Sequence, residues 1–158
     1  MGKARRKRSH RLRFDPVAIQ GESASANDPS TAPSEEQTHR LLSDLCSLSE
    51  YKRLQSLELF SSMTRFNPRF ITSDFLSKLN LRLVDSSLRV RVSAATTVRN
   101  IACDPELIPR LLEGGVASTI LSILMNEGEE LFFTVISENN EKTTSLFIHL
   151  LSALSNIW

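Results

Sequence analysis

The chain has 158 residues, of which 41% are hydrophobic, and this is enough to bury one core. Its two cysteines, Cys46 and Cys103, belong to no C-x-x-C or Cys/His cluster, which argues against a zinc site and against a disulfide-stabilised secreted protein. No run approaches the roughly 18 apolar residues of a membrane helix, so we expect no membrane partner.

The positive charge is concentrated at the amino terminus. Residues 1–14 hold seven Lys and Arg, and the rest of the chain holds 12 against 18 Asp and Glu, a net charge of −6. Such an arm is typical of segments that bind an acidic partner, which is RNA, a phospholipid surface or an acidic groove of a protein. Residues 21–34, GESASANDPSTAPS, contain no large apolar residue. We therefore predict a disordered basic arm and linker over residues 1–34.

Helical periodicity begins at residue 35. A first helix is predicted over residues 35–48, with Ser34 as its N-cap and with Leu41, Leu42, Leu45 and Leu48 on its apolar face. A second helix is predicted to end near Phe66, because the residue before Pro68 is disfavoured in helical geometry.

Two further helices and a short one follow. TSDFLSKLNLRLV and DSSLRVRVSAATTVRNIA each carry apolar residues at helical spacing. Their candidate N-caps are Thr72 or Ser73 for the first and Asp85, Ser86 or Ser87 for the second. Asp104-Pro105 ends the second of these helices, and PELIPRLLEGG predicts a short helix that stops at Gly114-Gly115.

The carboxyl-terminal third contains an acidic segment between two amphipathic ones. GVASTILSILMNEG predicts a helix that ends at Gly128, and TTSLFIHLLSALSNIW predicts the last helix. Between them, NEGEELFFTVISENNE contains the one β-prone run, LFFTVIS, and five glutamates: Glu127, Glu129, Glu130, Glu138 and Glu141. We interpret this segment either as a loop that contacts cargo or as a solvated loop between repeats.

Two of the helices recur along the sequence. Arg53, Leu57, Phe60 and Met63 align with Arg91, Ala95, Val98 and Ile101 at a constant offset of 38 residues. Asn100-Ile101 aligns with Asn156-Ile157 at an offset of 56, which returns to about 40 if residues 127–142 are an insertion. Periods near 40 are typical of armadillo and HEAT repeats, although any two amphipathic helices can be aligned on their apolar faces.

We therefore predict an all-α fold: an armadillo/HEAT-type helical repeat solenoid over residues 35–158, preceded by the disordered basic arm. Its predicted buried residues are Leu57, Phe60, Ala95, Val98, Leu121, Leu124 and Leu150.

Several motifs carry a family resemblance. DSSLRVRVSAATTVRNIA resembles the armadillo or HEAT helix pattern, with Asp85, Val90-Arg91, Ala94-Ala95 and Val98-Arg99-Asn100-Ile101 at the pattern positions. EGGVASTILSILMNE resembles the opening of the following armadillo helix, and ALSNIW resembles its close. Together with the start MGKARRKR and with Phe14-Asp15-Pro16, the chain resembles the amino-terminal portion of the symportins. These are HEAT-repeat adaptors that carry ribosomal proteins of the 5S ribonucleoprotein into the nucleus.

The resemblance implies a non-enzymatic adaptor that shuttles between cytoplasm and nucleus. It implies an importin-type receptor and large-subunit ribosomal proteins as partners, and an import signal of the proline-tyrosine type. The basic patch of that signal is Lys3, Arg5, Arg6, Lys7, Arg8 and Arg11, and its carboxyl end is Arg13, Pro16 and Val17, where Val17 replaces the usual tyrosine. Symportins continue through many more repeats, so we expect a truncated chain in which Leu151, Leu154, Ile157 and Trp158 lack the repeat that would cover them.

Two other interpretations of the arm remain open. An arginine-rich arm also suits an RNA-binding ribosome assembly factor that neutralises phosphates of ribosomal RNA, and the charges can simply solvate the chain end. Because His10, His39 and His149 lack a nucleophile and a carboxylate at motif spacing, we expect no catalytic site, cofactor or metal.

Overall fold

The computed structural model describes residues 34–64, 67–138 and 140–158. Within these ranges the chain forms seven α-helices and two short 3-10 helices, and no strand. The elements are α1 (Glu35–Asp44), α2 (Glu50–Thr64), η1 (Pro68–Phe70), α3 (Ser73–Leu83), α4 (Leu88–Ala102), η2 (Pro105–Leu107), α5 (Ile108–Glu113), α6 (Val116–Glu138) and α7 (Glu141–Ile157). The all-α prediction is confirmed for these residues. The predicted arm and linker lie outside them, apart from Ser34, and so does the predicted end of the second helix near Phe66.

The helix starts are determined by local side-chain hydrogen bonds. Ser34 and Gln37 form a reciprocal capping box at the start of α1, with Gln37 N–H donating to Ser34 Oγ at 3.2 Å and Ser34 N–H donating to Gln37 Oε1 at 2.9 Å. Thr72 caps α3, and Ser87 caps α4. The predictions of Ser34 and of these two caps are confirmed.

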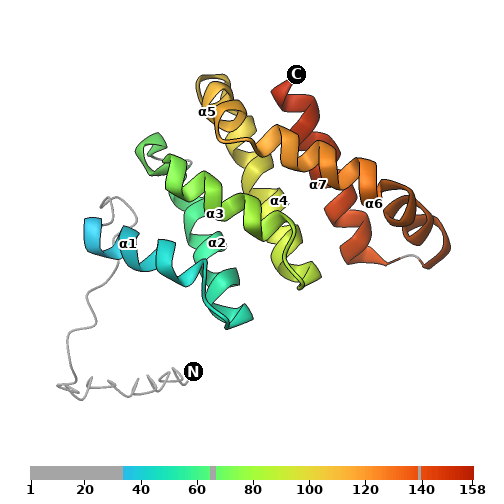
Figure 1. The fold of residues 1–158 in the computed structure, drawn as a ribbon, viewed down its shortest axis with the longest axis horizontal. Helices are drawn as coiled ribbons and strands as arrows, with labels where there is room; N and C mark the ends of the chain where they lie inside the picture. Colours follow the sequence, from blue (N-terminus) through green and yellow to red (C-terminus); the bar gives the residue numbers. More distant parts are fainter. Residues whose placement is uncertain (1–33, 65–66, 139) are drawn as a thin grey trace, which may run out of the picture. The chain divides into compact units, whose positions relative to one another are not determined.

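The helices pack as pairs in two layers. In one layer α2 packs against α4 and α4 packs against α7; in the other α3 contacts α6. The layers meet where α1 packs on α2, α3 on α4 and α6 on α7. Figure 1 shows α3 and α6 in front of α4 and α7.

The first helix is shorter than predicted. It ends at Asp44 rather than near Leu48, and the Leu48 side chain is fully exposed. The reason is a long-range contact, because Arg53 of α2 binds the carbonyl oxygens of Ser47 and Leu48 and holds this segment as a turn. An arginine that binds backbone carbonyls replaces the hydrogen bonds that a continued helix would have made.

The sixth helix is longer than predicted, and the predicted loop over residues 126–141 is wrong. Helix α6 continues through Gly128 and through the β-prone run to Glu138. Leu131 is buried, and the rings of Phe132 in α6 and Phe147 in α7 lie 6.3 Å apart. Packing on α7 therefore outweighs the roughly 1 kcal/mol that a glycine costs inside a helix.

The core follows the predicted stripes with two corrections. Leu57, Phe60, Ala95, Val98 and Leu150 are completely buried, as predicted. Leu121 is 38% exposed, and Leu124 is half-buried at the edge of the core. The inward stripe of α6 is formed instead by Val116, Ile120, Ile123 and Leu131, so Leu121 is turned away from the neighbouring helices.

Candidate functional site

The predicted import signal lies outside the described residues. This applies to all nine of its residues: Lys3, Arg5, Arg6, Lys7, Arg8, Arg11, Arg13, Pro16 and Val17.

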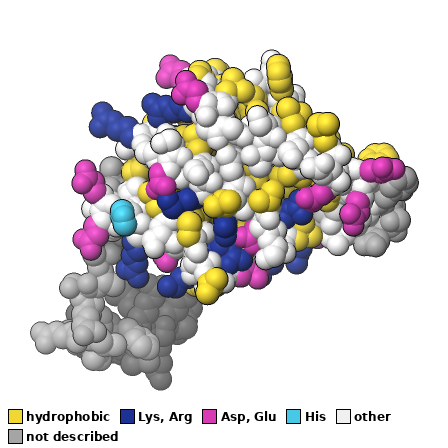
Figure 2. Space-filling model, viewed as in Figure 1, with side chains coloured by type: hydrophobic (Ala, Val, Ile, Leu, Met, Phe, Trp, Pro, Cys, Tyr) yellow, Lys and Arg dark blue, Asp and Glu magenta, His cyan; other side chains and the backbone are white. Residues whose placement is uncertain are grey.

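The predicted cargo glutamates lie on helices rather than in a loop. Glu127, Glu129, Glu130 and Glu138 belong to the second half of α6, and Glu141 is the first residue of α7. Glu129, Glu130 and Glu141 are exposed. Figure 2 shows acidic side chains at the end of the molecule where α6 and α7 meet. Glutamates from the second half of α6 and from the start of α7 are thus gathered at the end of the molecule where these two helices meet.

Arg53 of α2 binds its own turn and the next helix pair. Its Nη1 donates to the carbonyl oxygens of Ser47 and Leu48, each at 2.9 Å. Its Nη2 donates to Oδ1 of Asp85 at 3.0 Å, and Arg53 and Asp85 are only 8% and 9% exposed. Arg82 donates to Oδ2 of Asp85 at 2.8 Å. Asp85 therefore lies between two guanidinium groups at the turn before α4.

Arg91 of α4 makes the same kind of contacts 38 residues later. Its Nε donates to the carbonyl oxygen of Leu83, the last residue of α3, at 3.1 Å. Its Nη2 donates to Oε2 of Glu127 in α6 at 2.5 Å. Each arginine thus binds a backbone carbonyl oxygen that lies before its own helix and a carboxylate that lies later in the chain. Glu127 is therefore engaged in an ion pair with Arg91 that links α6 to α4.

Polar side chains that contact one another link α2, α4 and α7. They are Ser61, Arg99, Asn100, Cys103, His149 and Asn156, and together they are called the polar strip below. Asn100 Nδ2 donates to Ser61 Oγ at 3.0 Å, which links α4 to α2. Arg99 Nη1 lies 3.1 Å from His149 Nδ1, which links α4 to α7.

Asn156, like Asn100, contacts the preceding helix of the same layer. Asn156 Nδ2 of α7 donates to Sγ of Cys103, the C-cap residue of α4, at 3.7 Å. Asn100 reaches back from α4 to α2, and Asn156 reaches back from α7 to α4. Because an asparagine side chain both donates and accepts, two of them on one strip can pair with the N–H and C=O groups of an extended polypeptide.

The pKa of His149, a member of the polar strip, is lowered by its surroundings. Burial lowers the pKa of His149 below its usual 6.5, and the positive charge of Arg99 lowers this pKa further. The neutral ring therefore accepts a hydrogen bond at Nδ1 from the guanidinium group of Arg99. Protonation of the ring would remove this acceptor and place two positive charges side by side at the contact of α4 with α7.

A depression of 340 Å³ lies over α6 and the end of α3. It is lined by Val84, Ser118, Thr119, Ser122, Ile123, Asn126 and Glu127. Its single carboxylate belongs to Glu127, which Arg91 holds, and none of the lining residues is a histidine, lysine or cysteine. These residues offer no pair of groups for acid and base catalysis.

The described part of the chain holds neither a metal-binding cluster nor a single membrane-spanning helix. No group of three or more His, Cys, Asp or Glu residues there is arranged to hold a metal ion. No single helix among those residues is long and apolar enough to cross a bilayer; Pro105–Glu113 and Val116–Phe132 pass that test only together, as a pair bent by 71°.

No protein-family model, curated protein or solved structure matches the chain.

One sequence signal points to the polar strip. Asn100 and Asn156 recur at an offset of 56 residues, but neither was predicted to lie at a site. His149 was interpreted as a solvated or core histidine, and its contact with Arg99 joins residues 50 positions apart. Local periodicity does not reveal such pairings.

Proposed function

We propose that this chain is a non-enzymatic transport adaptor similar to the symportins. In this proposal a helical repeat scaffold binds a large-subunit ribosomal protein of the 5S ribonucleoprotein, and the basic arm binds an importin-type receptor. The complex then moves from cytoplasm to nucleus during assembly of the 60S subunit. The scaffold consists of armadillo/HEAT-type repeats over residues 35–158, with α1–α2, α3–α4 and α6–α7 as successive units.

Repeated contacts support the division into repeats. Arg53 and Arg91, 38 residues apart, each bind a backbone carbonyl oxygen before their own helix and a carboxylate later in the chain. The buried positions of α4 and α7 also correspond at an offset of 56: Val90, Ala94, Thr97 and Ile101 match Leu146, Leu150, Ala153 and Ile157. Such recurrence is what a stack of similar units requires, because each unit buries its apolar face only against its neighbours.

The polar strip is the observation that carries the binding role. It links three helices of one layer and repeats its asparagine from one unit to the next. A surface of this kind suits an extended segment of another protein, since the amide groups of the strip match a peptide backbone whatever its side chains are.

Charge supports a basic cargo. Outside the first fourteen residues the chain carries a net charge of −6. Glu141 lies eight residues before His149 on α7, which is about 12 Å along a helix axis, so exposed carboxylates lie within reach of a segment bound on the strip. Arg99 adds a positive charge within the strip, and basic residues of the cargo are therefore expected opposite the acidic end of α6 and α7.

The binding role is tested by removing the repeated asparagines. Asn100 and Asn156 are changed together to Ala, and the affinity for a purified 5S-ribonucleoprotein ribosomal protein is measured by calorimetry. We expect a loss of about tenfold, from about two hydrogen bonds at 0.5–1.5 kcal/mol each. Asn126→Ala, an exposed asparagine on α6, is the matched control. Unchanged affinity in the double variant would reject the polar strip as the cargo site.

The import role is tested with the arm alone. Residues 1–20 fused to an inert reporter should accumulate in the nucleus, and changing Arg5, Arg6, Lys7 and Arg8 to Ala should abolish this because the charge-assisted contacts to the receptor are lost. Changing Pro16 and Val17 to Ala should weaken accumulation if the carboxyl end of the signal occupies its own pocket.

The alternative function is that of an RNA-binding assembly factor. The seven basic residues of the arm favour it, because they can neutralise phosphates directly. It predicts that binding of the arm to ribosomal RNA weakens steeply with salt and is indifferent to the Pro16 and Val17 substitutions. A reporter that remains cytoplasmic while the arm binds RNA in this way would favour the assembly factor over the adaptor.

A further inference from the structure

The polar strip contains a half-buried positive charge that no carboxylate balances. Within residues 34–64, 67–138 and 140–158, the arginines that are buried or half-buried are Arg53, Arg82, Arg91 and Arg99. Arg53 and Arg82 pair with Asp85. Arg91 pairs with Glu127. In this part of the chain no Asp or Glu side chain forms a salt bridge with Arg99, so Arg99 differs from the other three in lacking a counter-charge.

The side-chain contacts of Arg99 are with neutral groups. Its Nη1 lies 3.1 Å from His149 Nδ1, and its Nη2 donates to Asn100 Oδ1 at 3.3 Å. Because a guanidinium group can only donate, Nδ1 is the acceptor and the ring of His149 is neutral in this contact. Burial lowers the pKa of His149, and so does the charge of Arg99, which keeps the ring neutral. Neither contact requires a full positive charge.

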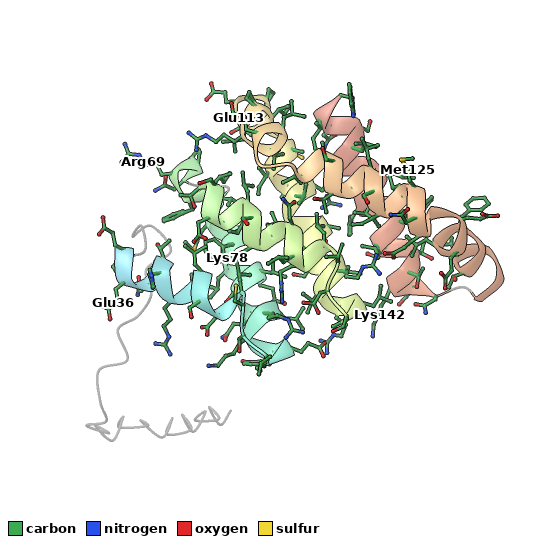
Figure 3. The ribbon with its side chains drawn as sticks, viewed as in Figure 1. Glu36, Arg69, Lys78, Glu113, Met125 and Lys142 are labelled. Atoms are coloured by element: carbon green, nitrogen blue, oxygen red, sulfur yellow. The ribbon has the colours of Figure 1, made fainter. Side chains whose placement is uncertain are left out.

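A charge in this position costs free energy. Removing part of the water around a guanidinium group is unfavourable, and an anion at the same place offsets the loss. Exposed cations do not carry this cost, because water surrounds them. Arg69 and Lys142 are exposed, and Figure 3 shows both at the edge of the molecule. A half-buried arginine at the contact of α4 with α7, with neutral partners only, is therefore suited to an anion from another molecule.

Arg99 keeps donors for such an anion. A guanidinium group has more N–H donors than its contacts with His149 and Asn100 use. Arg82 Nε is a buried nitrogen without a hydrogen-bond partner, whereas no nitrogen of Arg99 is buried in this way. The remaining donors of Arg99 therefore reach the surface of the molecule. Cys103, whose Sγ donates to the carbonyl oxygen of Arg99 at 3.3 Å, is exposed as well.

The charge balance favours a carboxylate over a phosphate. Arg99 supplies one positive charge, and His149 beside it is neutral. Outside the first fourteen residues the chain has a net charge of −6, which repels a nucleic-acid backbone or a doubly charged phosphate. A carboxylate carries a single negative charge, and its two oxygens match the planar guanidinium group through two parallel hydrogen bonds.

We propose that Arg99, at the contact of α4 with α7, binds a carboxylate of the polypeptide segment that lies on the polar strip. The carboxylate belongs to an Asp or Glu side chain or to the carboxyl end of that segment. The inference rests on the proposed function, because the segment is part of the cargo. Asn100 and Asn156 bind the backbone whatever its sequence, and Arg99 selects where along the cargo the strip binds.

The site itself is tested without cargo. Sodium acetate is added to the full chain at constant ionic strength, with sodium chloride as the reference, and the ring of His149 is followed by NMR. We expect a saturable shift of the ring resonances with acetate alone, and a higher pKa of His149, because the bound carboxylate offsets the charge of Arg99. Arg99→Gln should abolish the response to acetate. Arg89→Gln, at an exposed arginine of α4, is the matched control and should retain it.

The source of the carboxylate is tested with peptides. The probes are overlapping peptides of the ribosomal protein with amidated ends, and the last peptide is also made with its free carboxyl end. In the peptide that binds most tightly, each Asp or Glu is changed to its amide, and binding is measured by fluorescence anisotropy. We expect one loss of a carboxylate to weaken binding about tenfold, and to have no effect on binding to Arg99→Gln. The peptide group responsible identifies the source.

Two results would overturn the inference. One is an equal response of His149 to acetate and to chloride, or a response to acetate that Arg99→Gln retains. The other is a set of carboxylate losses that act equally on the wild type and on Arg99→Gln. Circular dichroism checks that Arg99→Gln is folded. If it is not, Arg99→Lys, which keeps the charge without the planar fork, should weaken the response to acetate, and an unchanged response would count against the site.

Failure of this inference can be separated from failure of the proposed function. If the double change of Asn100 and Asn156 to Ala weakens cargo binding but no carboxylate loss does, the proposed function stands and the role of Arg99 is rejected. If acetate binds at Arg99 but the double variant keeps its full affinity for cargo, the proposed cargo site fails, and the assignment of the carboxylate to cargo fails with it.

Discussion

Arg53 and Asp85 form a buried ion pair between helix α2 and the turn that precedes α4. Arg53 Nη2 donates to Asp85 Oδ1 at 3.0 Å, and Arg53 Nε lies 3.0 Å from Oδ2. The same carboxylate accepts hydrogen bonds from Arg82 and from the backbone N–H of Ser87, the N-cap of α4. One carboxylate therefore links the first helix pair to the start of the second pair.

Removing this carboxylate should strongly destabilise the protein. Asp85→Asn leaves the guanidinium group of Arg53 buried without its counter-charge, and we expect a loss of about 3 kcal/mol in the free energy of unfolding. Urea denaturation followed by circular dichroism measures it. Asp74→Asn is the matched control, because the exposed Lys78–Asp74 pair should contribute less than about 1 kcal/mol. Exposed ion pairs contribute about 1 kcal/mol or less to stability. If the two variants lose free energies of unfolding that differ by less than about 0.5 kcal/mol, the result would contradict a buried Arg53–Asp85 pair.

Glu127 should affect stability rather than cargo binding. Its side chain is 40% exposed and is paired with Arg91, so a double-mutant cycle with Arg91→Ala and Glu127→Gln should give a coupling energy of about 0.5 kcal/mol. Glu129→Gln, two residues along α6, serves as the control and should show no coupling to Arg91. Loss of ribosomal-protein affinity in Glu127→Gln without this coupling would instead support the predicted cargo role.

Gly128→Ala should stabilise the protein by roughly 0.5–1 kcal/mol. Gly128 lies inside α6, and a Cβ there would meet its nearest neighbour, Leu124 Cβ, at an ordinary contact distance of 4.0 Å. Differential scanning calorimetry measures the change. A stability that is unchanged or lower would argue that residues 126–138 do not form a continuous helix in solution.

Gly114→Ala should have the opposite effect. A Cβ at Gly114 would lie 2.9 Å from Leu76 Cβ and 3.1 Å from the carbonyl oxygen of Arg110, so α3 and α5 would have to separate. The carbonyl oxygen of Gly114 also accepts a hydrogen bond from Asn80 at 2.8 Å, which fixes the turn against α3. We expect a loss of about 1–3 kcal/mol, as for other overpacked sites. Equal unfolding midpoints for the two glycine variants would contradict this close approach.

His149 should make stability depend on pH below 6.5. Its pKa is lower in the folded chain than its usual 6.5, so the unfolded chain binds the proton first and stability falls as the pH decreases through this region. His149→Gln should flatten the dependence of the unfolding midpoint between about pH 6.5 and 5. His39→Gln, at an exposed residue of α1, is the control and should keep the wild-type slope. A wild-type midpoint that does not fall in this interval would contradict the burial of the ring against Arg99.

Features that depend on neighbouring residues were predictable from the sequence. Ser34, Thr72 and Ser87 cap their helices through partners three residues away. The glycine turn after α5 was predicted from the Gly114-Gly115 pair, and Gly115 there has a φ of 71°, a value that other residues rarely adopt. Short sequence separations, periodicity and residue type are sufficient for such features, and the core stripes of α2, α4 and α7 follow from the same reasoning.

The tertiary structure alone decided the features that depend on distant partners. Leu48 is exposed because Arg53 binds its carbonyl oxygen, and α6 continues past Gly128 because Leu131 and Phe132 pack in the folded chain. The partners in the ion pair of Arg53 with Asp85 are 32 residues apart, and those in the contact of Arg99 with His149 are 50 residues apart. Local propensities differ by about 1 kcal/mol or less per residue, so contacts between helices outweigh them wherever the two conflict.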